Sequence, residues 1–400
     1  MNTTPRPRIV IVGGGYAGTM AANRLSQADA DVVLVNPRPQ FVHRIRLHQW
    51  IAGTGTAEHD YTEVLADRVR LVVDTATRID APAGRVELAS GDTLDYDHLV
   101  YAVGSTATPA HTIAGVAEHG FVLGEWEGAQ RLRDHLAAVG ESDQSDQTTV
   151  VGGGLTGIEM AAELAESGHT VRLVCGGVLA PSFGSRARDV AQRRLRKLGV
   201  EILTDRRVEA VGDGTVTVVG DGVREILPSA TTIVAAGFGV PDLAATSGLT
   251  TDPAGRLITD ETLTSVDDPR IVGAGDAVAP SGVPFRMSCQ AANQLGPQAA
   301  DTVLARLAGT EPKPVRVAFV GQCTSLGRGG ATVQLTRLDD TPRHTVVTGR
   351  VAAGIKEFIC RNVIWGLNLE ARRPGAVPTF PVRPRPMAAE PPIESPIGAV

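Results

Sequence analysis

The chain has 400 residues, of which 42% are hydrophobic and 20% are charged, and its formal net charge is −6. This length predicts two or three domains, and the composition is that of an ordinary globular protein. The net negative charge gives no electrostatic basis for binding nucleic acid. No apolar run resembles a secretory leader or approaches the roughly 18 residues of a membrane span, so we expect a cytoplasmic protein.

The first informative stretch is a glycine-rich turn between a strand and a helix. Residues 8–12 predict a short buried strand and residues 19–25 predict a helix. Between them, Gly13, Gly15 and Gly18 complete the pattern Gly-x-Gly-x-x-Gly. These glycines allow a tight turn, close approach of a pyrophosphate and close packing of helix on strand, and the helix start offers N–H groups to phosphate. We predict a dinucleotide site here; a glycine turn without a ligand is the alternative.

The second predicted strand, residues 31–36, ends at Asn36, where dinucleotide folds usually carry an acid that binds ribose. Asn keeps hydrogen-bonding capacity but lacks the charge. The next loop is basic, and it is either a clamp for phosphate or a solvated surface. Its basic residues are Arg38, His43, Arg44, Arg46 and His48.

Short strands are predicted at residues 71–73, 85–88 and 96–101, and the last of these runs into a turn of small residues. Backbone can approach a ligand closely at such a turn, which here contains Ala102 and Gly104.

The strand, glycine pattern and helix start then recur. Residues 148–151 predict a strand, and Gly152, Gly154 and Gly157 repeat the spacing. Two such units are far more specific than one. They suit a pair of dinucleotides, of which one delivers hydride and the other receives it.

The strand after this second helix, residues 169–174, ends at Cys175 with no acid. Several arginines follow. If they face the ligand, they favour NADPH or a site that does not discriminate strictly between NADH and NADPH; the alternative is that they form a solvated helix face. These residues are Arg186, Arg188, Arg193 and Arg194.

Further strands are predicted at 201–203, 207–211, 215–219 and 232–236. A third strand-to-turn motif follows at residues 270–276, where Asp276 could bind sugar hydroxyls, although the motif could also be a simple turn.

Residues 287–308 predict a helix that Gly309 ends, and residues 315–334 return to strands. Residues 351–369 predict an amphipathic helix, either packed on the protein or on a second copy, or docked on a membrane with Lys356, Arg361, Arg372 and Arg373 on its polar side. The tail from 374 is Pro-rich and is expected to be extended or disordered.

The four cysteines form no C-x-x-C pair, which argues against a redox dithiol and against zinc, so we expect reduced thiols and no metal site. They are Cys175, Cys289, Cys323 and Cys360.

With these motifs, the chain resembles the two-dinucleotide-binding flavoproteins, the pyridine nucleotide–flavin oxidoreductases. It looks most like type II NADH dehydrogenases and the apoptosis-inducing-factor-like and ferredoxin-reductase-like branches. The resemblance implies an α/β fold with two Rossmann-like domains, the FAD-binding one discontinuous, and a C-terminal α+β region. The implied limits are 1–110 and 255–312 for FAD, 111–254 for NAD(P)H, 313–373 for an interface or membrane-docking region, and 374–400 for the tail.

The resemblance also implies roles for single residues. The FAD adenosine would lie near Asn36, the pyrophosphate near Arg44, the ribityl chain at Asp276 and the flavin ring near the backbone of Gln290 and Ala291. The cofactor-binding residues expected are Gly13, Gly15, Tyr16, Ala17, Gly18, Asn36, Arg44, Ala76, Ala102, Gly104, Gly275, Asp276, Gln290, Ala291, Gly152, Gly154, Leu155, Thr156, Gly157 and Gly237.

The candidate catalytic residues are Glu159 and His48. By resemblance, Glu159 would sit close to the nicotinamide, and the ferredoxin-reductase-like branch pairs this acid with a lysine near the flavin. Here that region reads Arg46-Leu47-His48-Gln49, so we expect the partner to be missing, or to be His48 or Gln49.

We therefore predict an FAD-dependent oxidoreductase that takes hydride from NAD(P)H and passes electrons to an acceptor, with quinone as the first choice. The alternatives are a ferredoxin-type reductase or a flavin dehydrogenase of a small organic substrate, and a non-catalytic flavoprotein with a degenerate nicotinamide site. The predicted partners are the small-molecule acceptor, a second copy in a homodimer, and the inner membrane face through residues 351–369.

Overall fold

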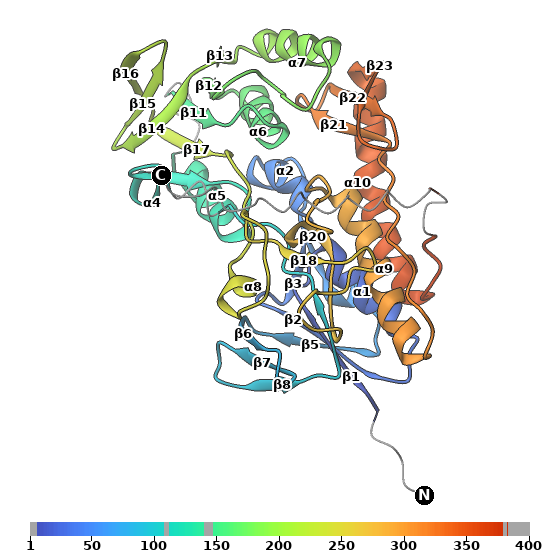
Figure 1. Cartoon of the computed structure of the whole chain (residues 1–400). Coiled ribbons are helices and arrows are strands. Elements are labelled where there is room, and N and C mark those ends of the chain that lie inside the picture. The colour runs from blue at the N-terminus through green and yellow to red at the C-terminus, as the bar shows by residue number, and fades with distance from the viewer. Residues whose placement is uncertain (1–5, 108–111, 140–146, 379–381, 383–400) are drawn as a thin grey trace, which may run out of the picture.

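The molecule contains two five-stranded parallel sheets, one in its upper part and one in its lower part as seen in Figure 1. The computed structural model describes residues 6–107, 112–139, 147–378 and 382. The first sheet contains β1 (Arg8–Val12), β2 (Asp31–Asn36), β5 (Val69–Val73), β9 (His98–Tyr101) and β19 (Ile271–Gly273). Its strand order is β19-β9-β1-β2-β5. Strand β19 comes from far along the chain and still pairs with β9, so this sheet is built from two separate segments.

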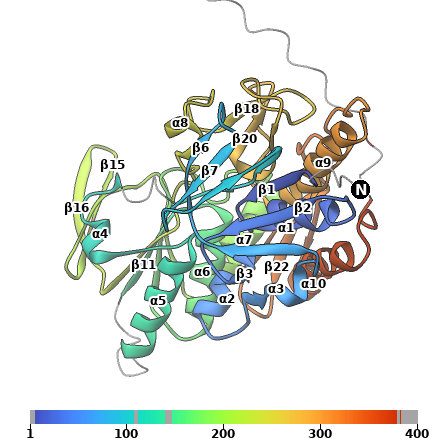
Figure 2. The same ribbon diagram turned by 90° about the horizontal axis from the view of Figure 1, so that it is seen from below.

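Helices cover the first sheet, and two of them touch at the backbone. They are α1 (Tyr16–Leu25) and α9 (Cys289–Leu307), which lie side by side in Figures 1 and 2. A Cβ added to Gly296 of α9 would lie 2.3 Å from Ala17 O of α1, so only glycine allows this approach. The contact fixes the late segment of the chain against the first helix.

The second sheet repeats the first. Its strands are β10 (Gly120–Val122), β11 (Thr148–Val151), β12 (Val171–Val174), β13 (Glu201–Leu203) and β17 (Thr231–Val234). In their order, β10-β17-β11-β12-β13, four strands match β9-β1-β2-β5 of the first sheet, but the edge strand β10 precedes the others in the chain whereas β19 follows them. The helices of this half are α4 (Val116–His119), α5 (Trp126–Val139), α6 (Leu155–Glu166) and α7 (Ser185–Lys197).

Each half also carries a three-stranded antiparallel sheet, which is inserted in the chain just before β9 in the first half and just before β17 in the second. In the first half this is β6 (Ala76–Asp80), β7 (Arg85–Leu88) and β8 (Thr93–Asp95). In the second half it is β14 (Arg207–Gly212), β15 (Thr215–Gly220) and β16 (Val223–Pro228). Strand β16 was not predicted, because its apolar residues do not alternate toward a core: Val223 and Ile226 are exposed.

Short elements complete the two halves. The strands are β3 (Gln40–Val42), β4 (Glu58–Asp60), β18 (Leu257–Thr259) and β20 (Val278–Pro280). The helices are η1 (Arg44–Arg46), α2 (Leu47–Ile51), α3 (Tyr61–Val64), α8 (Leu243–Thr246) and η4 (Gly275–Ala277).

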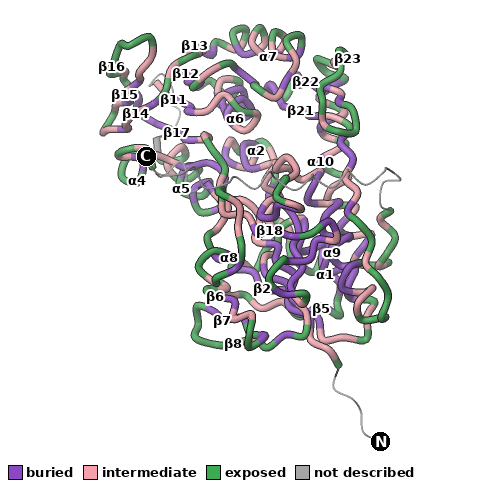
Figure 3. The backbone as a smooth tube through the Cα atoms, viewed as in Figure 1, coloured by how far each residue is buried: buried purple, intermediate pink, exposed green. Residues whose placement is uncertain are grey.

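The C-terminal region is a three-stranded antiparallel sheet and one long helix. The elements are β21 (Gly321–Ser325), β22 (Ala331–Thr336), β23 (Pro342–Thr348) and α10 (Gly349–Arg372). Helix α10 packs on β22 and on α1, so it connects the C-terminal sheet with the first half. Figure 3 shows buried backbone concentrated around α1 and α9, whereas the outer strand β16 is exposed.

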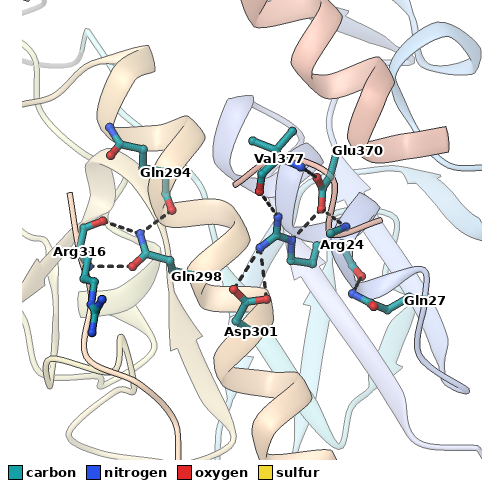
Figure 4. Close-up of polar contacts among 9 residues, drawn as sticks. Arg24, Gln27, Gln294, Gln298, Asp301, Arg316, Glu370 and Val377 are labelled. Carbon is teal, nitrogen blue, oxygen red and sulfur yellow. Dashed lines mark hydrogen bonds and ion pairs between the residues drawn. The ribbon is translucent and has the colours of Figure 1, made fainter. Parts of the chain in front are cut away.

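A buried ion pair anchors the end of α10 (Figure 4). Arg24 Nε of α1 donates to Glu370 Oε1 at 2.7 Å, and the two side chains are 5% and 0% exposed. Arg24 also pairs with Asp301 of α9 at 3.1 Å. Glu370 in turn accepts from the backbone N–H groups of Gly375 and Val377. One arginine therefore holds three segments of the chain together.

The predicted fold class is confirmed, and the predicted strand–glycine–helix units are present in both halves. Residues 351–369 lie within the single helix α10, as the amphipathic pattern indicated. Most of the predicted Pro-rich tail lies outside the described residues. Within the part of the chain that the structure describes, no helix combines the length and apolar character needed to cross a membrane.

Candidate active site

The first glycine loop is tightly packed on one side and open on the other. A Cβ on Gly13, which has φ +102°, would lie 2.4 Å from Ala102 O, and a Cβ on Gly18 would lie 1.8 Å from Gly13 O. A Cβ on Gly15 would meet nothing within 4 Å. Helix α1 begins at this open side with no side-chain cap on its N–H groups. The cradle therefore fits a pyrophosphate.

The second loop has the same geometry. A Cβ on Gly152, with φ +126°, would lie 2.6 Å from Ala235 O, and one on Gly157 would lie 2.0 Å from Gly152 O. A Cβ on Gly154 would again meet nothing within 4 Å. Helix α6 begins there without a side-chain cap, and Leu155 is its first residue. Both loops fit the phosphates of a dinucleotide.

Asn36 and Cys175 occupy equivalent places behind the two loops. Asn36 Oδ1 accepts from Gly14 N at 3.0 Å, and its Nδ2 donates to Arg38 O at 2.7 Å. A Cβ on Gly153 would lie 2.7 Å from Cys175 Sγ. The amide of Asn36 is therefore used in hydrogen bonds to backbone groups of the protein. Neither Asn36 nor Cys175 offers the carboxylate that ordinarily binds a ribose.

The ends of β9 and β19 bring several of the predicted residues together. Ser105 Oγ donates to Asp276 Oδ2 at 2.8 Å, and Arg44 Nη1 donates to Ser105 O at 2.9 Å. Ser288 N, at the start of α9, donates to Asp276 Oδ1 at 3.1 Å. Arg44, Gly104, Asp276 and the first turn of α9 thus form one group beside the first loop.

A buried charge cluster lies where the two halves meet. Lys356 Nζ of α10 is 2.8 Å from Glu159 Oε1 of α6. His48 Nδ1 of α2 is 3.5 Å from Glu159 Oε2. Ser325 N, at the end of β21, donates to Glu159 Oε1 at 2.9 Å. All three ionisable side chains are buried, so the cluster acts in a medium of low dielectric constant, where charges interact strongly.

The electrostatics of this cluster define its charge state. Burial would raise the pKa of Glu159, but Lys356, His48 and the hydrogen bonds outweigh it and the pKa falls below its ordinary value. Burial would lower the pKa of Lys356, but Glu159 raises it well above the ordinary value. Burial lowers the pKa of His48 from 6.5 to about 4, against the opposing effect of Glu159. At neutral pH the cluster therefore holds a carboxylate, an ammonium and a neutral imidazole.

Two hydrogen bonds connect the first loop with α10, the helix that carries Lys356. Tyr16, next to Gly15, has its hydroxyl 3.0 Å from His43 Nδ1. His43 Nε2 is 3.1 Å from Cys360 O, one helical turn after Lys356. Because a carbonyl only accepts, Nε2–H donates to Cys360 and Nδ1 accepts from Tyr16. The lysine is thus held in a fixed place relative to the first loop.

The expectation for the partner of Glu159 was wrong in one respect. The partner is a lysine, Lys356, which the sequence placed on the polar side of a membrane-docking helix. His48 does lie beside Glu159, but Gln49 instead accepts from Arg46 at 2.7 Å. A pattern in the sequence indicated the buried position of Lys356. Ala352, Lys356 and Cys360 are four residues apart, and all three lie on the buried side of α10.

Sequence reasoning also missed a ladder of three glutamines on α9. Gln294 donates to Ala318 O and accepts from Ala318 N, each at 2.9 Å. Gln298 does the same with Arg316, at 2.9 and 2.7 Å (Figure 4). In the amide orientation that satisfies both groups, Gln290 donates to Gly321 O and accepts from Val320 N. The ladder fixes the extended segment that leads into β21 and so positions Ser325 against Glu159.

The remaining candidates lie elsewhere or serve the fold. Ala76 is on β6 and packs into the core, and Gly237, with φ +77°, follows the segment that contacts Gly152. Arg194 pairs with Glu166 of α6. All four cysteines are free, and among the described residues no group of three or more acidic, histidine or cysteine side chains could hold a metal ion.

The chain matches the family described as pyridine nucleotide-disulphide oxidoreductase over residues 7–301. A NADH dehydrogenase-like protein of Mycobacterium tuberculosis is 30% identical over 353 residues, which cover 81% of this chain and 86% of the relative. A type II NADH:quinone oxidoreductase of Staphylococcus haemolyticus is 28% identical over 390 residues, covering 88% of this chain and 94% of the relative. The solved structure of NDH2 from Plasmodium falciparum in complex with NADH has a TM-score of 0.77 at 16% identity, covering 92% of this chain and 97% of that chain.

These likenesses confirm two sets of expectations. The structural likeness confirms an α/β fold with two dinucleotide-binding units. The family match confirms an oxidoreductase that uses FAD and NAD(P)H. Both agree with the two open glycine cradles.

Proposed function

The chain belongs to the pyridine nucleotide-disulphide oxidoreductase family, and on that premise we propose that it oxidises NAD(P)H through a bound FAD and reduces a quinone. The quinone is carried over from the Staphylococcus haemolyticus relative. The observation that carries the proposal is the buried Lys356–Glu159 pair, which joins the second half of the molecule to α10 and is tied through His43 to the first loop.

The two cradles have different occupants in this proposal. FAD binds the first loop, with Arg44 and Asp276 along the cofactor, and NAD(P)H binds the second loop. When bound, the flavin supplies the chemistry of accepting a hydride and releasing its electrons. The single cofactor contacts and the domain limits 1–110, 111–254, 255–312 and 313–373 stay predictions.

The buried cluster serves the acceptor. The Lys356 ammonium stabilises negative charge that develops on a quinone oxygen, because it is fixed in place and shielded from water. Glu159 holds that ammonium and, once it has taken up a proton, passes it to the reduced acceptor. Neutral His48 lies beside the second oxygen of Glu159, with Nδ1 3.5 Å from Oε2.

The test uses the FAD-loaded full chain under anaerobic conditions in a stopped-flow spectrometer. NADH or NADPH should bleach the flavin absorbance, and a water-soluble short-chain ubiquinone should then restore it. Restoration by ferredoxin but not by quinone would overturn the choice of acceptor. A failure of both nicotinamides to bleach the flavin would overturn the proposal and favour a non-catalytic flavoprotein.

The outer side of α10 provides the route to a lipid-soluble acceptor. Val351, Phe358 and Trp365 recur every seventh residue and are 68%, 67% and 62% exposed. This stripe, together with Arg361 on the same exposed side, is typical of a helix that lies on a membrane surface. We place the enzyme on the inner membrane face through this stripe; a second copy that covers it in a homodimer is the competing outcome.

A further inference from the structure

Helix α6 carries a second buried carboxyl group, Glu163, one turn after Glu159. Its side chain is 1% exposed. One oxygen, Oε1, accepts from the hydroxyl of Thr54, and Thr54 itself is exposed to solvent. The other oxygen, Oε2, is buried and has no hydrogen-bond partner within the described ranges. An unpartnered buried polar atom is costly, so this one calls for a function.

A second unpartnered atom lies on the neighbouring helix. His48 Nε2, the ring nitrogen not facing Glu159, is also buried without a hydrogen-bond partner in the part of the chain described. Helix α2, which carries His48, packs against α6, and Thr54 follows α2 with its N–H donating to Gln49 O. Polar atoms of His48 and Glu163 are thus left unpaired on the two helices that enclose the site.

The spacing places the two carboxyl groups in line. Residues one turn apart on a helix have Cβ atoms about 5–6 Å apart, on the same side. Glu159 is the inner group, in contact with Lys356, and Glu163 is the outer group, in contact with Thr54 at the surface. The line runs from solvent to the buried ion pair.

The surroundings of Glu163 raise the pKa of its carboxyl group above the ordinary value. Burial raises its pKa, and the neighbouring carboxylates Glu166 and Glu159 add to this. The hydrogen bond from Thr54 and the charge of Arg328 oppose it without reversing the direction. The groups further in, by contrast, are already fixed as a carboxylate, an ammonium and a neutral imidazole. Along the line, Glu163 is the group whose environment favours holding a proton.

The proposed reaction needs such a group. Its balance is NAD(P)H + H⁺ + quinone → NAD(P)⁺ + quinol: the hydride brings two electrons and one proton, and the second proton comes from water. We propose that Glu163 and Thr54 form the route by which this second proton reaches Glu159 and the acceptor. Glu163 gives its proton to the Glu159 carboxylate, Glu159 passes it to the quinol oxygen, and water at Thr54 restores the proton of Glu163. Both carboxyl groups then return to their starting states.

This inference rests on the proposed function, so the test separates the two half-reactions. Glu163→Gln keeps the size of the side chain and its contact with Thr54 but cannot release the proton. In anaerobic stopped-flow with the FAD-loaded full chain, NADH should bleach the flavin of this variant at the wild-type rate. Restoration by short-chain ubiquinone should be slower by about tenfold or more, since a positioned proton donor contributes about 10²–10⁴-fold. The solvent isotope effect on that step should rise, and Glu163→Asp should recover part of the rate.

Glu201→Gln is the matched control. Glu201 lies on β13 of the same half, is half exposed and pairs with Arg172. Both half-reactions of this variant should proceed at wild-type rates. A quinone step in Glu163→Gln within twofold of wild type, with an unchanged isotope effect, would overturn the relay and leave the proposed function intact. A wild-type protein that quinone cannot reoxidise would instead overturn the proposed function.

Thr54→Val tests the outer end of the route if Glu163→Gln does not fold. Thr54 is exposed, and valine keeps its shape while removing the hydroxyl. The quinone step should slow severalfold, and Thr54→Ser should restore it. Equal rates in Thr54→Val and wild type would count against the relay.

Discussion

Glu159 and Lys356 form a buried ion pair between two helices that belong to different parts of the fold: Glu159 lies on α6 of the second sheet unit, and Lys356 lies on the C-terminal helix α10. Neither charge has solvent to stabilise it, so each depends on the other. The pair is therefore a structural connection as well as a chemical group.

Breaking this pair should destabilise the protein strongly. Lys356→Met leaves the Glu159 carboxylate buried and uncompensated, and such changes cost about 3–5 kcal/mol. The double variant Lys356→Met/Glu159→Gln buries no charge and should recover most of that loss. Urea unfolding midpoints of the two variants measure the coupling between Lys356 and Glu159. Arg361→Met, which removes an exposed ion pair with Glu357, is the control and should lower the free energy of unfolding by less than about 1 kcal/mol. Equal midpoints for the single and double variants would contradict the coupling.

Breaking the ion pair between Arg24 and Glu370, at the C-terminal end of α10, should lower the stability by a similar amount. Arg24→Met removes the partner of the fully buried Glu370, so we expect a loss of about 3–5 kcal/mol and faster proteolysis after residue 372. Arg6→Met is the control, because Arg6 and its partner Asp29 are 65% and 79% exposed. The same cleavage rate in Arg24→Met and Arg6→Met would show that the ion pair between Arg24 and Glu370 does not hold the end of α10.

Two glycines of the second loop should behave in opposite ways. A methyl group at Gly154 meets no protein atom, so Gly154→Ala should leave the unfolding midpoint unchanged and weaken NAD(P)H binding, because the methyl group occupies the cradle. A methyl group at Gly157 would lie 2.0 Å from Gly152 O, so Gly157→Ala should destabilise the fold. Titration of the nicotinamide and thermal unfolding distinguish these effects; normal binding by Gly154→Ala would remove the second loop as the nicotinamide site.

Acid should destabilise the protein through its buried histidines. Burial, helped by the charge of Arg46, lowers the pKa of His43 from 6.5 to about 3, and burial lowers that of His48 from 6.5 to about 4. Between these values and 6.5 the unfolded chain binds more protons than the folded protein, so stability falls as the pH drops below 6.5. Each histidine contributes up to about 1.4 kcal/mol per pH unit in that window. Urea midpoints measured from pH 7 to pH 4.5 should fall less steeply in His48→Gln than in wild type, and parallel curves would argue against a neutral His48.

The exposed stripe of α10 should carry the membrane affinity. Phe358→Ser and Trp365→Ser each remove an aromatic group worth about 1.5 kcal/mol or more when buried, so co-sedimentation with anionic vesicles should weaken about tenfold per substitution. Ile226→Ser, at an equally exposed apolar residue on β16, is the control and should bind as wild type. Vesicle binding that survives both α10 changes, with loss of a dimer on size exclusion, would show that a second copy covers the stripe.

The fold was predictable where a local rule applies. Gly13 and Gly152 must adopt positive φ at the end of a strand, and this requirement is visible in sequence as the glycine spacing. The four-residue spacing of Lys356 with Ala352 and Cys360 indicated its buried position, but its partner could not be predicted because that carboxylate comes from another helix. The Gln294 and Gln298 contacts were hidden for a similar reason: their partners are backbone groups of an extended segment, which no side-chain pattern marks.

Lys356 and Phe358 point to opposite flanks of α10, one buried and the other exposed. The two flanks of a helix are separated by its width, about 10–12 Å with side chains. A membrane bound through Phe358 would therefore lie about one helix width from the Lys356 ammonium. The ring of a lipid-soluble acceptor would then have to move only that distance from the membrane, while its long tail stays in the hydrocarbon.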